Sequence, residues 1–309
     1  MFRSFLELCR ISNLPTVWTN VTAAWVLGGG PLAETSKWLW LLLGASLVYS
    51  AGMILNDTFD ATWDQEKRPE RPIPSGRVPL SLAWSAGIVG LVAGYGLMLT
   101  YGGSAWLFTT ALVGAIVLYD AYHKPWTGSV FVMGACRTLL YMAAASAAFA
   151  VQRHLHQGAV IILEALIACP AVVSGAYVVA LTLIARAEGK GAIKPEERRN
   201  LTLLLMVPAA YAVAAAILTT CITSHRQGPT PSPLLYTVVP LAAFVGWTWN
   251  ALRQMRKGGP AIGQAVGLLL AGIPLVDAIN IAVVEPSTAL AFCLLPPLLR
   301  YWQRWVAAT

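Results

Sequence analysis

Hydrophobic residues in this chain form long runs separated by short polar connections. Runs that approach the roughly 20 residues needed to cross a bilayer predict membrane-spanning helices. Ten candidates are found: Thr16–Gly30, Trp38–Leu55, Leu82–Tyr101, Ser104–Tyr119, Ser129–Val151, Ala159–Ala185, Leu201–Ile222, Leu234–Leu252, Ala261–Val284 and Thr288–Leu299. The last run is short, which is typical of a half-helix or an interfacial helix. The pattern predicts an all-α fold, a polytopic transmembrane helical bundle of nine or ten spans, with residues 1–309 forming one integral-membrane domain.

The composition supports this class. Of the 309 residues, 57% are hydrophobic and 11% are charged, whereas soluble domains carry about 25% charged residues. The five cysteines are scattered and show neither the spacing of a metal site nor a disulfide framework. We interpret them as small apolar packing residues: Cys9, Cys136, Cys169, Cys221 and Cys293.

The basic residues are distributed unequally between the two sides of the predicted bundle. Fifteen lie in connections on the side of the N-terminus: Arg3, Arg10, Lys67, Arg68, Arg71, Arg77, Lys124, Arg186, Lys190, Lys194, Arg198, Arg199, Arg253, Arg256 and Lys257. The opposite connections hold only Lys37, Arg153 and Arg226. By the positive-inside rule, the N-terminus faces the cytoplasm of the cell inner (plasma) membrane. The net charge of +7 thus indicates orientation, and we expect no nucleic-acid partner.

Three aspartates follow the second hydrophobic run. On a helix continued from that run, the spacing of Asp57, Asp60 and Asp64 places their carboxylates on one face. Such carboxylates repel one another unless a cation lies between them, and Mg²⁺ is usually held by one or two carboxylates together with substrate phosphates. Asn56 adds a neutral oxygen. The alternative is a solvated acidic helix end, which does not explain the basic residues that follow at once, Lys67, Arg68 and Arg71.

Other charged residues lie at the ends of the hydrophobic runs or inside them. Lys124 either pairs with a phosphate or contributes only to orientation, and His123 is interpreted as an interfacial histidine. Arg137 lies within a hydrophobic run, where a charge is expensive and is usually paired, so its partner is either a substrate diphosphate or an internal carboxylate. Asp277 follows Gly272 and Pro274, which suggest a broken or kinked span. Its role is either functional or structural.

The acidic segment resembles the first aspartate-rich motif of the UbiA superfamily of intramembrane prenyltransferases. The resemblance covers Asn56-Asp57-x-x-Asp60-x-x-x-Asp64, the trailing Arg68, and the loop Arg71-Pro72-Ile73-Pro74-Ser75-Gly76. It extends to Tyr119 and Lys124, followed by Thr127, Gly134 and Arg137, which are similar to the family's next Tyr/Lys region.

The second aspartate-rich motif of that family is altered in this sequence. If Glu188-Gly189 matches the family's usual Glu-Gly, its two aspartates are replaced by Arg186 and Lys190, and Glu188 is the remaining acidic candidate. This change, together with the segment 12–18, resembles the EboC-type branch, which is associated with gene clusters for secondary metabolites.

The resemblance implies a prenyltransferase with cytoplasmic active-site loops. Mg²⁺ would hold the diphosphate of an isoprenoid donor, the allylic C–O bond would ionise, and an aromatic or other lipophilic acceptor would attack the carbocation. The catalytic candidates are Asp57, Asp60, Asp64, Tyr119 and Lys124, and the Mg²⁺ candidates are Asn56, Asp57, Asp60 and Asp64. The diphosphate candidates are Arg68, Arg71, Lys124, Arg137, Arg186 and Lys190, with Glu188 and Asp277 as further site candidates.

Two alternatives to prenyl transfer remain open. In a UbiA-type terpene cyclase, the ionised donor would attack its own double bonds. In a non-catalytic lipid-binding or transport component of a secondary-metabolite pathway, the fold would persist without the chemistry. The altered second motif favours the non-catalytic role, whereas the intact first motif disfavours it. Membrane lipid is an expected partner in every case.

Overall fold

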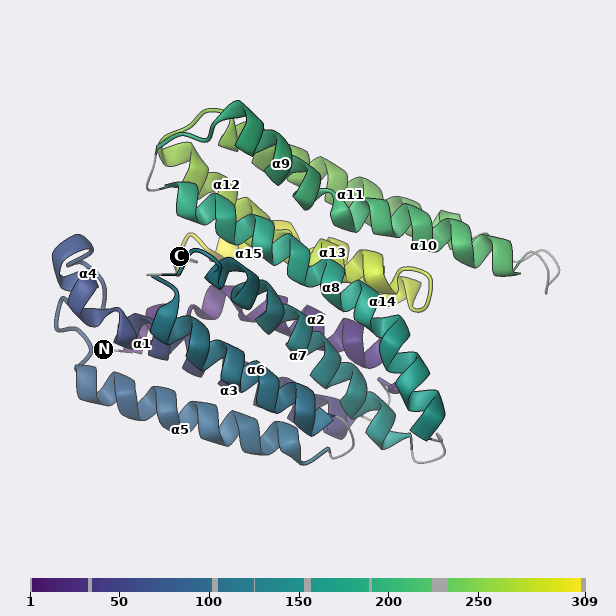
Figure 1. The fold of residues 1–309 in the computed structure, drawn as a ribbon, viewed down its shortest axis with the longest axis horizontal. Coiled ribbons are helices and arrows are strands. Elements are labelled where there is room, and N and C mark those ends of the chain that lie inside the picture. Colours follow the sequence, from purple (N-terminus) through teal and green to yellow (C-terminus); the bar gives the residue numbers. More distant parts are fainter. Residues whose placement is uncertain are drawn as a thin grey trace.

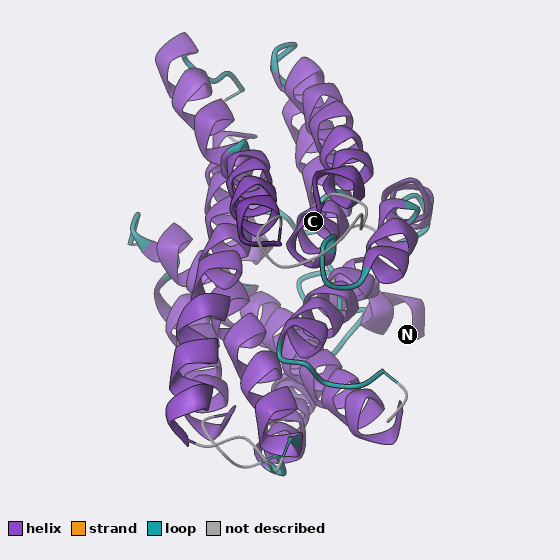
Figure 2. Cartoon of the chain, turned by 90° about the vertical axis from the view of Figure 1, so that its right-hand side faces the viewer, coloured by secondary structure: helices purple, strands orange, loops and turns teal. Residues whose placement is uncertain are grey.

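The computed structural model describes residues 2–32, 35–101, 105–124, 126–152, 157–188, 191–223 and 233–306. Over these ranges the regular elements are helical, as Figure 2 shows, which confirms the predicted all-α class. The elements are α1 (Phe2–Leu8), η1 (Ile11–Asn13), α2 (Leu14–Leu27), α3 (Thr35–Phe59), α4 (Ala61–Lys67), α5 (Leu80–Leu99), α6 (Ala105–Tyr122), α7 (Ser129–Val151), α8 (Gln157–Glu188), α9 (Pro195–Leu205), α10 (Val207–Thr223), α11 (Pro233–Met255), α12 (Pro260–Ala271), α13 (Ile273–Ile281), α14 (Pro286–Cys293) and α15 (Leu295–Trp302).

Eight segments of the described chain are long and apolar enough to cross a membrane, and they correspond to eight of the ten predicted runs. The protein is therefore an integral membrane protein. The first predicted run forms α2, which has 14 residues, and the last is divided between α14 and α15, with eight residues each. These two runs are helical but shorter than a full span.

The break predicted around Gly272 is confirmed. α12 ends at Ala271 and α13 begins at Ile273, with Pro274 near the start of α13. Proline fits the first turn of a helix but lacks the N–H needed in its interior, so the chain resumes as a second helix. Together α12 and α13 form one candidate span that is 83% buried inside the protein, whereas the α6 span is only 22% buried. The broken span therefore lies at the centre of the bundle.

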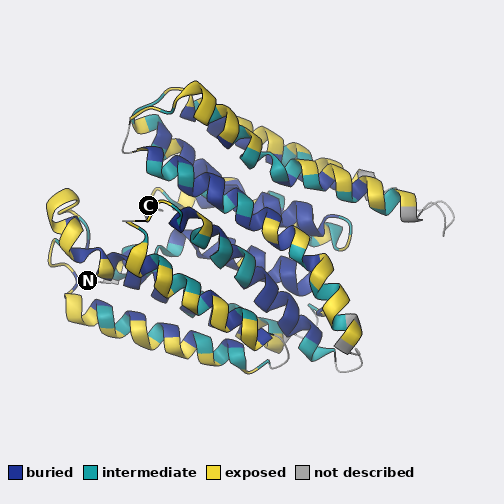
Figure 3. Cartoon of the chain, in the orientation of Figure 1, coloured by how far each residue is buried: buried dark blue, intermediate teal, exposed yellow. Residues whose placement is uncertain are grey.

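The remaining helices surround this centre (Figure 1). α3 packs on α5, α7 packs on α2, α6 and α8, and α12 packs on α8 and α11. Figure 3 shows that exposed residues concentrate on the outer helices, including α5, α10 and α11. Many of these side chains are apolar, such as Val89 and Leu235, as a surface facing lipid requires.

A close helix contact fixes α8 beside α7. A Cβ atom added at Gly134 of α7 would lie 2.8 Å from the carbonyl oxygen of Gly175 in α8. Because only glycine lets the two backbones approach so closely, small residues at this contact hold the helices together. This packing brings the C-terminal end of α8 to the connection between α6 and α7, next to the end of α3.

Candidate functional site

The acidic motif lies where α3 ends and α4 begins. Asp60 stands between the two helices, but the turn continues, because the Asp60 N–H donates to the Asn56 carbonyl at 3.1 Å and the Asp64 N–H donates to the Asp60 carbonyl at 2.8 Å. Asp57, Asp60 and Asp64 are all buried. Three carboxylates from two turns of chain are thus withdrawn from solvent, which excludes the solvated acidic helix end.

Arg71 contacts two of these carboxylates. Its Nη1 lies 2.8 Å from Asp64 Oδ2 and 3.3 Å from Asp57 Oδ1. Burial, together with the charges of Asp60 and Asp57, raises the pKa of Asp64 above its usual value, although the Arg71 guanidinium opposes this. Arg71 is brought back to the motif by the loop after α4, where the Ser75 N–H and hydroxyl both donate to the Arg71 carbonyl.

The third carboxylate is paired from a different part of the chain. Lys124 Nζ lies 2.6 Å from Asp60 Oδ1, and His123 Nε2 lies 3.5 Å from Asp60 Oδ2. Burial favours the protonated form of Asp60, but hydrogen bonds and charge from His123 and Lys124 outweigh it, so the pKa of Asp60 is lowered. Lys124 also lies 4.2 Å from the centre of the Trp63 ring. His123, which the sequence predicts to be an interfacial histidine, is therefore a partner of Asp60.

Sequence reasoning missed two residues of this site. Arg10 lies in the left-handed backbone region, at φ 44°, and its Nη2 lies 3.3 Å from Asp57 Oδ1. Asp120 is buried in α6 and accepts a hydrogen bond from the Asn56 side-chain amide at 3.1 Å. Asp120 could have been found from the sequence, because it is a carboxylate at the end of an apolar run and directly follows Tyr119. Nothing in the sequence pattern indicates the backbone conformation of Arg10.

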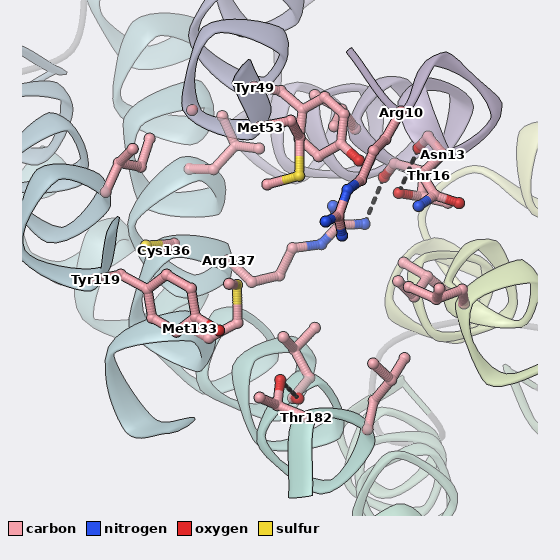
Figure 4. Close-up of a pocket in the computed structure, with 18 of the residues that line it drawn as sticks. Arg10, Asn13, Thr16, Tyr49, Met53, Tyr119, Met133, Cys136, Arg137 and Thr182 are labelled. Carbon is pink, nitrogen blue, oxygen red and sulfur yellow. Dashed lines mark hydrogen bonds between the residues drawn. The ribbon is translucent and has the colours of Figure 1, made fainter. Parts of the chain in front are cut away.

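A cavity of about 270 Å³ lies beside the motif. Most of its wall is apolar, from side chains such as Leu140, Leu181 and Val266, and one region is polar, with Arg10, Asn13, Tyr49, Tyr119, Asp120 and Arg137. Figure 4 shows Arg10 and Arg137 extending toward one another from different elements, with Tyr49 and Tyr119 nearby. A second, more open pocket of about 420 Å³ is lined by Asp60, Trp63 and Lys124, and Asp120 contributes to both pockets.

The residues around the motif suit a magnesium ion that is shared with a substrate. In the described part of the chain, no group of three or more His, Cys, Asp or Glu residues could hold a metal ion by itself. Two buried carboxylate oxygens there, Asp64 Oδ1 and Asp120 Oδ2, have no hydrogen-bond partner. Mg²⁺ needs only one or two carboxylates when phosphate oxygens and water complete its octahedral shell. The donors fit such an ion, while the assignment of Asn56, Asp57, Asp60 and Asp64 as its ligands stays a prediction.

The two charged residues inside apolar runs pair with each other. Arg137 Nη2 lies 3.7 Å from Asp277 Oδ2 and also donates to the Thr16 carbonyl. Asp277 further accepts hydrogen bonds from the Thr19 hydroxyl at 2.7 Å and the Asn20 amide at 3.3 Å. Asp277 therefore has a structural partner set, and Arg137 has an internal carboxylate partner while also lining the cavity.

Arg186, which is predicted to belong to an altered second motif, lies close to the first motif but contacts different atoms. Arg186 donates to the Thr127 carbonyl at 2.7 Å, the His123 carbonyl at 3.1 Å and the Ser129 hydroxyl at 2.6 Å. Glu188 is exposed at the end of α8, and Arg68 is exposed after α4. Lys190 lies outside the described residues. The structure thus brings Arg71, Lys124 and Arg186 to the region of the first motif.

Comparison with known proteins gives a consistent result. The model of the UbiA prenyltransferase family matches residues 14–262. Over 122 residues the chain is 33% identical to digeranylgeranylglyceryl phosphate synthase of Sulfolobus acidocaldarius, which covers 38% of this chain and 42% of that protein. Over 144 residues it is 32% identical to 4-hydroxybenzoate octaprenyltransferase of Pectobacterium atrosepticum, which covers 42% of this chain and 48% of that protein. The chain thus spans less than half the length of these curated relatives.

One solved structure shares the fold. It is described as giving structural and mechanistic insights into the biosynthesis of digeranylgeranylglyceryl phosphate synthase in membranes, has a TM-score of 0.55 at 17% identity and covers 92% of this chain and 99% of that one. A UbiA homolog from Archaeoglobus fulgidus bound to GPP and Mg²⁺ has a TM-score of 0.40 at 13% identity, with coverage of 91% and 99%.

Proposed function

Because this chain belongs to the UbiA prenyltransferase family, we propose that it ionises an isoprenoid diphosphate with Mg²⁺ and transfers the prenyl group to a lipophilic, aromatic acceptor. The observation that carries the proposal is the cavity beside the acidic motif. Its apolar wall suits a prenyl chain, and its polar region holds Arg10, Arg137 and Asp120. An amphiphile with an anionic head and a hydrocarbon tail matches both parts.

The reaction breaks the allylic C–O bond, and the bonding electron pair leaves with the diphosphate. The acceptor then supplies the electron pair for the new bond and loses a proton. Mg²⁺ held by carboxylates of the first motif would supply positive charge to the leaving diphosphate. Arg71 and Lys124 hold those carboxylates and add fixed positive charge at the site. The rings of Tyr49 and Tyr119 line the cavity and stabilise a carbocation through their π faces.

The position of the chain in the membrane and in its family completes the proposal. The excess of basic residues on the N-terminal side supports an orientation in the plasma membrane in which the N-terminus and the acidic motif face the cytoplasm. The segment 12–18 and the replacement of an acidic residue by Arg186 support membership of the EboC-type branch.

The test uses purified protein in nanodiscs with geranyl, farnesyl or geranylgeranyl diphosphate, with Mg²⁺ present or chelated. Pyrophosphate release and organic-extractable products are followed, first without acceptor and then with 4-hydroxybenzoate as an aromatic probe. We expect Mg²⁺-dependent release that Asp57→Ala or Asp60→Ala abolishes and that Glu196→Gln, a change at an exposed carboxylate on α9, leaves intact.

The products separate the alternatives. A prenylated acceptor supports the transferase, whereas a cyclic hydrocarbon formed without acceptor identifies a terpene cyclase. The proposal would be refuted if protein that unfolds cooperatively showed no pyrophosphate release and no Mg²⁺-dependent diphosphate binding. That result would indicate a non-catalytic lipid-binding component.

A further inference from the structure

The connection between α6 and α7 carries the side chains that pair with Asp60. Lys124 Nζ lies 2.6 Å from one Asp60 carboxylate oxygen, and His123 Nε2 lies 3.5 Å from the other. The His123 ring also stacks on the Tyr119 ring, with centroids 5.0 Å apart. The position of this connection therefore decides whether Asp60 has a cationic partner, yet the connection lies outside both helices that it joins.

Arg186 reaches this connection from the C-terminal turns of α8. Its Nη1 donates to the Thr127 carbonyl at 2.7 Å, and its Nη2 lies within hydrogen-bonding distance of the His123 carbonyl, at 3.1 Å, and the Ser129 hydroxyl, at 2.6 Å. The acceptors lie at the beginning and the end of the connection. One guanidinium therefore ties both of its ends to a third helix.

Ser129 completes the arrangement. This residue is fully buried at the first position of α7, and its hydroxyl lies 3.0 Å from the His123 carbonyl and 2.7 Å from the Trp126 carbonyl. Because the hydroxyl oxygen also accepts from Arg186, the guanidinium, the hydroxyl and the carbonyls form one connected network. The network is specific to a donor-rich side chain at position 186.

We propose that Arg186 is a positioning residue whose guanidinium holds the α6–α7 connection so that His123 and Lys124 remain on Asp60. The proposal deepens the proposed function, on which its catalytic consequence rests, by assigning a role to the position where the family's second motif has an aspartate. An aspartate there could only accept hydrogen bonds, so the Thr127 and His123 carbonyl oxygens, which also only accept, would lose their donor. In this chain the position therefore orders the first motif through Lys124 and does not form a second carboxylate metal site.

This role competes with direct binding of the diphosphate by Arg186. Both terminal nitrogens of the guanidinium are engaged by the connection. A move toward a diphosphate would release bonds that the connection uses. The two roles therefore predict different effects of Arg186 on the order of residues 123–129, and this order can be measured in the protein without any donor.

The experiment compares Arg186→Gln, Arg186→Lys and Ser129→Ala with the wild-type protein in nanodiscs. Arg199→Gln is the matched control, because Arg199 is an exposed arginine on α9. Hydrogen–deuterium exchange of the peptide covering residues 123–129, and chemical labelling of the Lys124 amine, are measured without donor. Donor KM and kcat are then measured separately.

We expect Arg186→Gln to raise exchange of this peptide and labelling of Lys124 by about tenfold, since it removes several charge-assisted hydrogen bonds. Arg186→Lys should show nearly the same increase in exchange and labelling as Arg186→Gln, because an ammonium group cannot span acceptors at both ends of the connection. Ser129→Ala should act in the same direction by a smaller factor, and it tests the network if Arg186→Gln fails to fold. Arg199→Gln should match the wild-type protein.

Two results would overturn the proposal. The first is unchanged exchange and labelling in Arg186→Gln and Ser129→Ala together with a raised donor KM in Arg186→Gln, which would assign Arg186 to the diphosphate. The second is unchanged exchange, labelling and kinetics, which would leave Arg186 without this role. Because exchange and labelling need no turnover, they judge the positioning role even if the protein proves not to be a prenyltransferase.

Discussion

Replacing Arg71 with alanine tests whether the acidic motif depends on cations supplied by the protein. Arg71 contacts Asp64, whose side chain is 1% exposed, and Asp57, whose side chain is 9% exposed. Removing one partner of a buried ion pair typically costs about 3–5 kcal/mol, because the other charge is left uncompensated. The Arg71 side chain is itself 17% exposed, and Arg10 still contacts Asp57. We therefore expect a loss of about 2–3 kcal/mol in the free energy of unfolding.

The assay is reversible denaturant unfolding in mixed micelles, without donor and with Mg²⁺ chelated. Four proteins form a double-mutant cycle: wild type, Arg71→Ala, Asp64→Asn and the double variant. Because Asp64→Asn removes the carboxylate that Arg71→Ala would leave unpaired, the double variant should be more stable than the sum of the single effects predicts, by about 1–2 kcal/mol. Arg71→Lys should lie between wild type and alanine, since its ammonium keeps the positive charge but lacks the planar guanidinium with its five fixed donors. Additivity within about 0.5 kcal/mol would refute the reasoning.

Three further predictions concern the cavity, the buried pair and pH. Ala45 is a buried residue that lines the cavity. Its replacement by phenylalanine should lower kcat/KM for geranylgeranyl diphosphate about tenfold more than for geranyl diphosphate, and equal losses would contradict a prenyl-binding cavity. Asp277→Asn should destabilise the protein by about 3 kcal/mol by leaving Arg137 uncompensated, and adding Arg137→Met should restore part of the loss in thermal unfolding. Because the pKa of Asp60 is lowered in the folded protein, its carboxylate stabilises the fold above the pKa of about 3.9 that it has in the unfolded chain. This contribution is lost as pH falls through the folded-state pKa. Unfolding of Asp60→Asn should therefore depend less on pH below about pH 4.5 than unfolding of the wild type.

The sequence predicted those features that depend on local pattern. Hydrophobic run length located the spans, and the spacing of Asp57, Asp60 and Asp64 predicted a shared helix face because the helical period acts over a few residues. The break at Gly272 was predicted for the same reason, from the conformational preferences of neighbouring residues.

Features that depend on contacts between distant segments were not readable in this way. The Arg137–Asp277 pair joins α7 to α13, and either partner could have met another charge. Arg10, which contacts Asp57, has a left-handed backbone conformation before η1, which its residue type does not favour. Asp120 gains its place in the site from the packing of α6 against α3, which brings it to Asn56.

Two carboxylates of the site share an arrangement that bears on metal binding. Asp64 has one oxygen bonded to Arg71 and Asp120 has one oxygen bonded to Asn56, while the other oxygen of each is buried and lacks a hydrogen-bond partner within the described residues. A donor that fixes one carboxylate oxygen orients the other toward a ligand, which is the usual role of groups just outside a metal's coordination shell. Arg71 and Asn56 therefore contribute by orienting the Asp64 and Asp120 carboxylates, and each unpartnered oxygen can accept a further bond without loss of either hydrogen bond. Charge supplied by Arg71 also lowers the repulsion between Asp57 and Asp64, so the two carboxylates can stay together without a bound metal ion.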